Sequence, residues 1–232
     1  MIDFTPYVEE FKNAITNTWL TPRGIIFSEG FALCSLIKHF DVDLMIESGV
    51  AYGGSTEMMA QFTNKPIMAI DTFATYSDSY EYANRRMSKY DNVILIQGDS
   101  YEKIPEILRS FKDNKIGLFI DGPKGIEAVE LAHRIYFEDD RIKFICIHDI
   151  KYRSSEAVRC KLVFNDVIFT DEPHGYFSNV RDKIDSHMLM LNEKICNISK
   201  SSLDPGQGLG YLQTLLKETP YGNGMAVIVR NE

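Results

Sequence analysis

The stretch of sequence that decides the fold is LMIESGVAYGGS, residues 44–55. It opens with an apolar run, turns polar at Glu47, and places Gly49 and Gly53 ahead of Ser55. Glycine lets the backbone approach a ligand closely, and a helix that begins after such a turn offers free N–H groups to an anion. We interpret the stretch as a strand, a turn and the start of a helix, with a turn suited to a nucleotide or an amino-acid carboxylate.

Further short apolar runs follow, each separated from the next by a segment long enough for a helix or a loop. They cover residues 67–70, 93–96, 116–120, 142–147, 167–170 and 225–229. Nearly continuous apolar strands that alternate with helices are typical of a parallel sheet covered on both faces. The sequence therefore predicts an α/β fold: a doubly wound, mostly parallel seven-stranded sheet of the Rossmann-like type.

The length of 232 residues and the mass of 26.5 kDa favour a single domain, residues 1–232. Within it we expect a helical N-terminal extension over residues 1–42 and a cofactor-binding core over residues 43–150. The polar, turn-rich residues 172–223 are interpreted as an insertion or lid before the last strand.

The N-terminal extension carries two helical patterns, over residues 6–20 and 28–40. Apolar residues keep helical spacing in the second pattern, and Ser28 is the expected N-cap residue. A third helix is expected over residues 154–165.

Composition excludes several classes of function. Lys plus Arg number 25 against 33 Asp plus Glu, a net charge of −8, which disfavours nonspecific nucleic-acid binding. No apolar run reaches the roughly 18–20 residues that span a bilayer, and the start MIDFTPYVEE lacks a signal-peptide pattern, so we expect a cytoplasmic protein without a membrane partner. The four cysteines are far apart and suggest neither a disulfide framework nor a zinc site.

Polar residues follow five of the expected strands. These strand ends are Glu47-Ser48-Gly49, Asp71, Gly98-Asp99-Ser100, Asp121-Gly122 and His148-Asp149. In open α/β sheets, ligands bind outside the carboxyl ends of the strands. We therefore expect the five polar ends to converge on one crevice.

The pattern E-x-G-x-x-x-G-x-S, an acidic residue after the second strand and G-D-S after the third resemble the class I S-adenosylmethionine-dependent methyltransferases. The small catechol-type and macrocin-type (sugar) O-methyltransferases are the most similar, over roughly residues 25–150. The resemblance implies S-adenosylmethionine as cofactor. Its implied contacts are Gly49 and Gly53 under the methionine part, Glu47 and Ser55 at its polar ends, Asp71 at the ribose, Asp99 or Ser100 at the adenine edge, and Thr72 as a further cofactor-binding residue.

Methyl transfer to oxygen requires that the acceptor hydroxyl lose a proton, so the site needs a base or a Lewis acid. Asp121 and Asp149 follow adjacent strands and form an oxygen-ligand pair suited to Mg²⁺. Lys124 is able to accept the proton if a nearby cation and partial burial lower its pKa. The D-x-x-K spacing is similar to that of catechol-type enzymes, which implies Asp121 as metal ligand and Lys124 as base.

The fifth strand end departs from that family pattern. Those families usually carry Asp-Asn or a second acidic pair, whereas this chain has His148-Asp149. Two alternatives stay open. His148 is either a third metal ligand, which favours Mn²⁺ or Fe²⁺ over Mg²⁺, or a general base in a site with a weak metal or none.

Taken together, the sequence predicts a S-adenosylmethionine-dependent O-methyltransferase, assisted by Mg²⁺ or Mn²⁺. The expected acceptor is a small polyhydroxylated molecule, with a sugar or a sugar-containing natural product as first choice. One alternative is an NAD(P)-dependent oxidoreductase, which the absence of G-x-G-x-x-G disfavours. The other is a noncatalytic cofactor-binding domain. The oligomeric state, a homo-oligomer included, is left open.

Overall fold

The structure is a computed structural model that describes residues 2–15, 25–173, 177, 180, 181, 184 and 224–230. The described strands are β1 Leu44–Ser48, β2 Ile67–Asp71, β3 Val93–Gln97, β4 Ile116–Ile120, β5 Ile142–His148, β6 Val167–Phe169 and β7 Met225–Val229. The described helices are the short 3-10 helix η1 Thr5–Tyr7 and α1 Val8–Ala14, α2 Phe27–Phe40, α3 Gly54–Phe62, α4 Ser79–Met87, α5 Ser100–Ser110, α6 Gly125–Glu138 and α7 Ser155–Val163.

All seven strands form one sheet in the order β3-β2-β1-β4-β5-β7-β6. The strands from β3 to β5 are parallel, and β7 runs antiparallel to both β5 and β6. The order reverses between β1 and β4, which is the topological switch point where α/β sheets bind ligands. The doubly wound, mostly parallel seven-stranded sheet expected from the sequence is confirmed.

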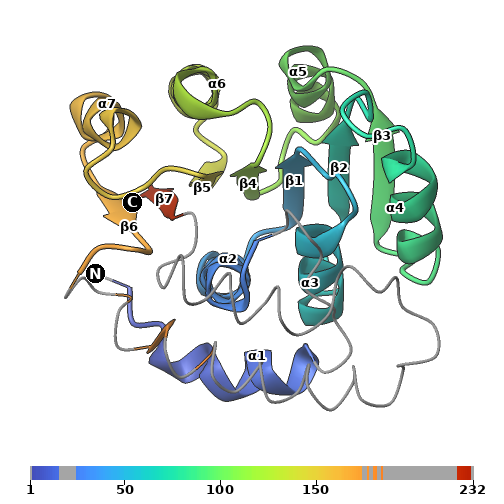
Figure 1. Ribbon diagram of the computed structural model, residues 1–232, viewed down its shortest axis with the longest axis horizontal. Helices are drawn as coiled ribbons and strands as arrows, with labels where there is room; N and C mark the ends of the chain where they lie inside the picture. Colours follow the sequence, from blue (N-terminus) through green and yellow to red (C-terminus); the bar gives the residue numbers. More distant parts are fainter. Residues whose placement is uncertain are drawn as a thin grey trace.

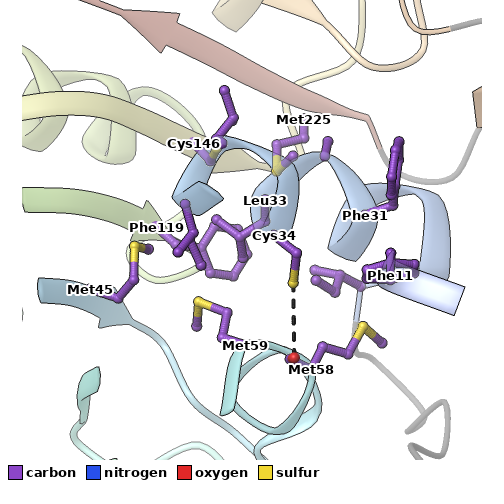
Figure 2. Close-up of a cluster of buried hydrophobic side chains, with 14 of the residues drawn as sticks. Phe11, Phe31, Leu33, Cys34, Met45, Met58, Met59, Phe119, Cys146 and Met225 are labelled. Carbon is purple, nitrogen blue, oxygen red and sulfur yellow. Dashed lines mark hydrogen bonds between the residues drawn. The ribbon is translucent and has the colours of Figure 1, made fainter. Parts of the chain in front are cut away.

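Helices cover both faces of the sheet, with α2 and α3 on one side and α5, α6 and α7 on the other (Figure 1). Successive strand residues point to opposite faces, so Met45 packs in one core and Leu44 and Ile46 in the other. Figure 2 shows the first core, where Cys34 and Cys146 are buried among methionine and phenylalanine side chains. Both cysteines therefore pack as small apolar residues.

In the described part of the N-terminal extension, residues 5–14 and 27–40 are helical, and α1 packs against α2 and α3. The first expected helix covers residues 6–20, and its residues 16–20 lie outside the described residues. The prediction of Ser28 as N-cap is wrong. Helix α2 begins at Phe27, and Ile26 is its N-cap residue. The Ile26 backbone N–H donates to the Glu29 carboxylate at 3.0 Å, and Ser28 is buried within the first turn.

The bounds of the seven strands and of the third expected helix lie within one or two residues of the ranges expected from the sequence. The third expected helix is α7, where the Ser154 hydroxyl accepts from the Ala157 N–H at 3.1 Å. The insertion or lid over residues 172–223 lies almost entirely outside the described residues. No helix in the described part of the chain has the length and apolar character that crossing a membrane requires.

Candidate functional site

A cavity of about 740 Å³ opens at the carboxyl ends of the parallel strands. Among its lining residues are Gly49, Asp71, Thr72, Asp99 and Ser100, which the sequence predicts to bind the cofactor. Its other side is lined by Asp121, Lys124, His148 and Asp149, which the sequence predicts to carry the chemistry. The structure therefore brings the two groups to one cavity, of a volume typical of small-molecule sites. We call the first side the cofactor half and the second the acceptor half.

The turn after β1 depends on glycine. Gly49 has φ +92°, and a Cβ placed on it would lie 2.5 Å from the Gly122 backbone nitrogen in the loop after β4. A side chain there would force the two loops apart, so only glycine allows the turn to pass so close to β4. The close approach places the β1 and β4 loops side by side at the centre of the cavity.

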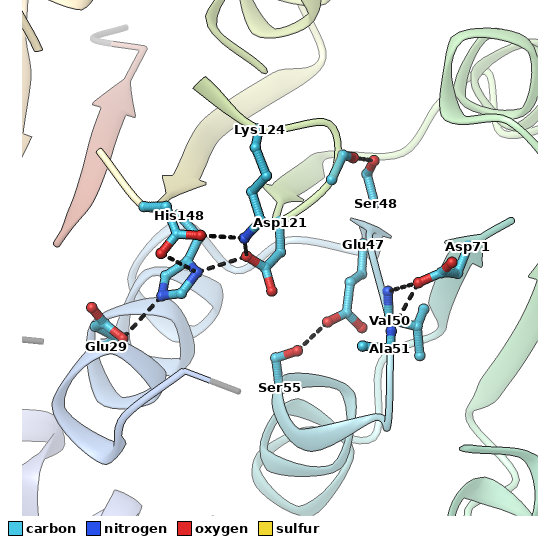
Figure 3. Close-up of polar contacts among 12 residues, drawn as sticks. Glu29, Glu47, Ser48, Val50, Ala51, Ser55, Asp71, Asp121, Lys124 and His148 are labelled. Carbon is cyan, nitrogen blue, oxygen red and sulfur yellow. Dashed lines mark hydrogen bonds and ion pairs between the residues drawn. The ribbon is translucent and has the colours of Figure 1, made fainter. Parts of the chain in front are cut away.

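Asp71 holds this turn in place from the end of β2. One of its carboxylate oxygens accepts from the Val50 and Ala51 N–H groups, both at 2.8 Å (Figure 3). The other oxygen accepts from the Phe73 N–H at 2.7 Å. Asp71 thus aligns the loop with three backbone hydrogen bonds while it still faces the cavity. Its contact with a ribose stays a prediction.

Glu47, Gly53 and Ser55 are not among the residues that line the cavity. The buried Glu47 carboxylate accepts a hydrogen bond from the Ser55 hydroxyl (Figure 3). It accepts a second one, at 2.5 Å, from the Thr56 hydroxyl. Burial raises the pKa of Glu47 to about 8, although the two hydroxyls act in the opposite direction. These residues join β1 to the start of α3, and their direct contact with a cofactor stays a prediction.

The G-D-S sequence after β3 forms the start of α5. Asp99 is the N-cap residue, and its carboxylate accepts from the Tyr101 N–H at 2.7 Å. The Ser100 hydroxyl accepts from the Ser48 hydroxyl at 2.6 Å and so ties α5 to the end of β1. Tyr76, which sequence reasoning missed, lines the same cavity, and its ring stacks on Tyr52 with centroids 5.6 Å apart.

The acceptor half is a network of charged side chains rather than of backbone groups. His148 Nδ1 lies 2.6 Å from Asp121 Oδ1 and 3.5 Å from Asp149 Oδ1. The Lys124 ammonium contacts both Asp121 and Asp149. Figure 3 shows Lys124 and His148 converging on Asp121 from the loop after β4 and the end of β5.

The charges in this network stabilise one another. Burial alone would lower the pKa of His148, but Asp121 and Glu29 outweigh it and hold the pKa well above its ordinary value. Burial would raise the pKa of Asp121, yet His148 and Lys124 bring it below its ordinary value. Burial would lower the pKa of Lys124, and the two aspartates raise it instead. The condition under which Lys124 accepts a proton, a pKa lowered by a nearby cation and partial burial, is therefore not fulfilled by its contacts with the two aspartates.

Sequence reasoning missed one acidic residue of this network, Glu29. It comes from α2 in the N-terminal extension, is buried, and places a carboxylate oxygen 3.2 Å from His148 Nε2 (Figure 3). The only local signal is its position three residues after the N-cap, where glutamate commonly completes a capping box. That position does not reveal a contact with a strand far along the chain.

Asp121, His148 and Asp149 form a candidate metal centre. Each offers one ligand atom, and these atoms lie within 4.8 Å of one another. Two carboxylates and an imidazole are a donor set that Mg²⁺ or Mn²⁺ accepts, with oxygen ligands from water or substrate in addition. The residues fit such an ion, provided that Lys124 leaves the carboxylates and that His148 Nδ1 gives up its proton.

No family model and no curated protein sequence matches the chain. Several solved structures have a similar fold. One is described as a caffeoyl-CoA O-methyltransferase from Staphylococcus aureus, at 16% identity, with 100% of this chain and 93% of that chain covered and a TM-score of 0.48. Another is an O-methyltransferase from Bacillus cereus in complex with SAH, at 14% identity, 99% and 92% coverage and a TM-score of 0.49.

A third similar structure is a TDP-rhamnose 3'-O-methyltransferase of calicheamicin biosynthesis, at 14% identity, 59% and 67% coverage and a TM-score of 0.42. The strand order carries the fold assignment: six strands run in one direction, and β7 lies antiparallel between β5 and β6, as in the Rossmann-like methyltransferase fold.

Proposed function

We propose that this chain is a S-adenosylmethionine-dependent O-methyltransferase that acts on a hydroxyl group of a small polyhydroxylated acceptor. One observation carries the proposal. A single cavity at the switch point of a methyltransferase-type sheet joins a glycine turn organised by Asp71 to a set of ionisable side chains around Asp121. The first half suits a nucleoside cofactor, and the second suits the handling of a hydroxyl proton.

In the cofactor half, the chain provides a close-fitting backbone and a rim of polar groups. The Gly49 turn offers an approach free of side chains, Asp71 and Thr72 face the position proposed for the ribose, and Asp99 and Ser100 face that proposed for the adenine. S-adenosylmethionine, when bound, supplies the methyl group from a positively charged sulfonium. The acidic side chains that line the cavity favour that positive charge.

In the acceptor half, the chain has to position a hydroxyl and take its proton. Lys124 is our first candidate for the base, because it is half exposed at the cavity and sits three residues after Asp121. To accept a proton it has to leave the two aspartates, since its contacts with them raise its pKa. His148 is the second candidate, but its two ring nitrogens face carboxylates, an environment that favours the protonated ring.

The proposed metal site is Asp121, His148 and Asp149. A divalent cation held there would supply a Lewis acid that polarises the acceptor hydroxyl. Because one ligand is an imidazole, Mn²⁺ suits the site better than Mg²⁺ does. The donor atoms themselves come from β5 and the loops after β4 and β5, so their spacing is set by the sheet.

The charge of the cavity supports a neutral acceptor such as a sugar. Carboxylates predominate among its ionisable lining residues, with Asp71, Asp99, Asp121, Glu127 and Asp149 against Lys124 and His148. Carboxylates accept hydrogen bonds from hydroxyl groups and repel polyanions. Both effects favour a polyhydroxylated acceptor over a highly phosphorylated one.

Calorimetric titration with S-adenosylhomocysteine and with NAD tests the cofactor. We expect binding of the first only, and binding of NAD alone would favour the oxidoreductase instead. Methyl transfer is then measured with S-adenosylmethionine carrying a labelled methyl group, on a panel of sugars and phenols, with Lys124→Ala as the inactive reference. Binding of S-adenosylhomocysteine without turnover on any acceptor in the panel would favour a noncatalytic domain.

A further inference from the structure

Glu29 is a buried carboxylate that the proposed function leaves without a role. It lies on the first turn of α2, outside the cofactor-binding core, and only 1% of its surface is exposed. Its Oε2 atom accepts from the Ile26 backbone N–H at 3.0 Å and lies 3.2 Å from His148 Nε2. Its Oε1 atom is buried and has no hydrogen-bond partner among the described residues.

This arrangement is costly for a helix cap alone. A carboxylate at the start of a helix stabilises the helix equally well when it is exposed to water, whereas a buried oxygen without a partner carries a desolvation penalty. The cap contact therefore does not explain why Glu29 points inward. The contact that requires the inward direction is the one with His148, which is itself only 3% exposed.

The contact determines how the imidazole ring sits. A carboxylate accepts hydrogen bonds and donates none, so the nitrogen that faces Glu29, Nε2, has to carry a proton. The other nitrogen, Nδ1, is then the one that faces the acidic pair, at 2.6 Å from Asp121 Oδ1 and 3.5 Å from Asp149 Oδ1. Glu29 is the contact that assigns Nε2 to the side of α2 and leaves Nδ1 on the side of the two aspartates.

We propose that Glu29 is a positioning residue of the acceptor half: it binds the Nε2 proton of His148 and thereby directs Nδ1 toward Asp121 and Asp149. This makes the N-terminal helix α2 part of the site. Metal-binding histidines show the same arrangement: one ring nitrogen binds the metal, and the other commonly donates to a carboxylate that fixes the orientation of the ring. The inference rests on the proposed function only for its effect on turnover.

Nitrogen NMR of the ¹⁵N-histidine-labelled protein tests the orientation directly, with the His148 signals assigned by their loss in His148→Phe. In the wild type we expect a proton on Nε2 that exchanges slowly with water. Glu29→Gln keeps an acceptor oxygen and should keep this signal, whereas Glu29→Met should lose it. A wild-type ring with an unprotonated Nε2, or an unchanged Nε2–H signal in folded Glu29→Met, would overturn the proposal.

Glu57→Met is the matched control, because Glu57 is an equally buried glutamate on α3 that pairs with Arg86 and Lys89. It removes a buried carboxylate of the same size without touching His148. If the Glu57 variant changed the His148 signals as much as Glu29→Met did, the effect would be a general loss of packing and the proposal would fail.

Co²⁺ binding and turnover provide the functional readout. Glu29→Met should weaken Co²⁺ binding, followed by its visible absorption, by about 10- to 100-fold and lower kcat, with Glu29→Gln restoring most of both. The affinity for S-adenosylhomocysteine should not change. If wild-type protein binds no S-adenosylhomocysteine and transfers no methyl group, the methyltransferase function fails, while the NMR and Co²⁺ results still decide the role of Glu29.

Discussion

The two halves of the cavity are built in different ways. In the cofactor half, the carboxylates of Asp71 and Asp99 accept from backbone N–H groups of the loops at the strand ends, and Gly49 lets the backbone pass close to β4. In the acceptor half, side chains contact side chains, with His148 between Glu29 and Asp121, and Lys124 between the two aspartates. The cofactor half is therefore formed by backbone loops that side chains hold in place, and the acceptor half by charged side chains that contact one another.

This difference predicts different responses to substitution. Removing a side chain from the cofactor half takes away a few hydrogen bonds, and the backbone that surrounds the ligand remains. Removing one charge from the acceptor half leaves its partners without compensation, which is costly where the group is buried. Substitutions in the acceptor half should therefore have larger effects, and they should affect turnover rather than cofactor binding.

The largest effect is expected for Lys124→Ala. If Lys124 is the base, kcat should fall by about 10²- to 10⁴-fold, the usual contribution of a general base, with little change in the affinity for S-adenosylhomocysteine. Steady-state kinetics and calorimetry measure the two quantities. Lys112→Ala is the matched control, because Lys112 is exposed and does not line the cavity. If Lys124→Ala retained more than about a tenth of the wild-type kcat, the role of Lys124 as general base would be excluded.

The second effect concerns the metal. Activity should fall on chelation and return with Mg²⁺ or Mn²⁺, and Asp149→Ala should abolish this recovery, because one of the two carboxylates is lost. The loss of metal affinity should exceed the roughly 10- to 100-fold that loss of an indirect partner costs. Asp140→Ala, at an exposed aspartate that does not line the cavity, is the control. Full activity after exhaustive chelation would exclude a metal requirement.

The contrast between the two halves also explains which site residues can be predicted from the sequence. The cofactor half comes from contiguous motifs: Gly49 sits in a turn directly after a strand, and Asp71 and Asp99 end the next two strands. Because parallel strands end at one edge, their order along the chain already predicts that these residues meet. Asp121 and Asp149 were found by the same reasoning.

What the sequence does not reveal depends on packing. Glu29 reaches His148 only because α2 lies against the sheet, and its local pattern indicates a helix cap and nothing more. The raised pKa of Lys124 likewise depends on two carboxylates, Asp121 and then Asp149, of which the second is brought to it by the β4–β5 pairing. Charges that come from separate elements alter one another's pKa only once the fold has assembled them.

In the cofactor half, Asp71→Ala should weaken S-adenosylhomocysteine binding by about 1–3 kcal/mol, or about 5- to 150-fold in Kd. The variant loses the proposed ribose contact and the acceptor for the Val50, Ala51 and Phe73 N–H groups. Asp71→Asn separates these contributions, because one amide oxygen still accepts from the loop. Calorimetry gives both affinities, and an unchanged Kd in folded Asp71→Ala would contradict the ribose placement.

The smallest effect is one of stability, at Glu47 beneath the cofactor half. Because burial raises the pKa of Glu47 to about 8 in the folded protein, against 4.5 as its ordinary value, the folded state holds a proton that the unfolded state has released between these two pH values. The free energy of unfolding contributed by Glu47 should therefore fall as the pH rises, by about 1.4 kcal/mol per pH unit within that window. The Gln side chain of Glu47→Gln is neutral at every pH, so this variant loses the dependence. Between pH 6 and pH 7 the unfolding free energy of the variant, relative to that of the wild type, should therefore rise by about 1.4 kcal/mol. Urea denaturation of both proteins at the two pH values measures this shift. A difference that stays constant would show that Glu47 is already ionised beneath the cofactor half, and that half would then depend on a buried charge as the acceptor half does.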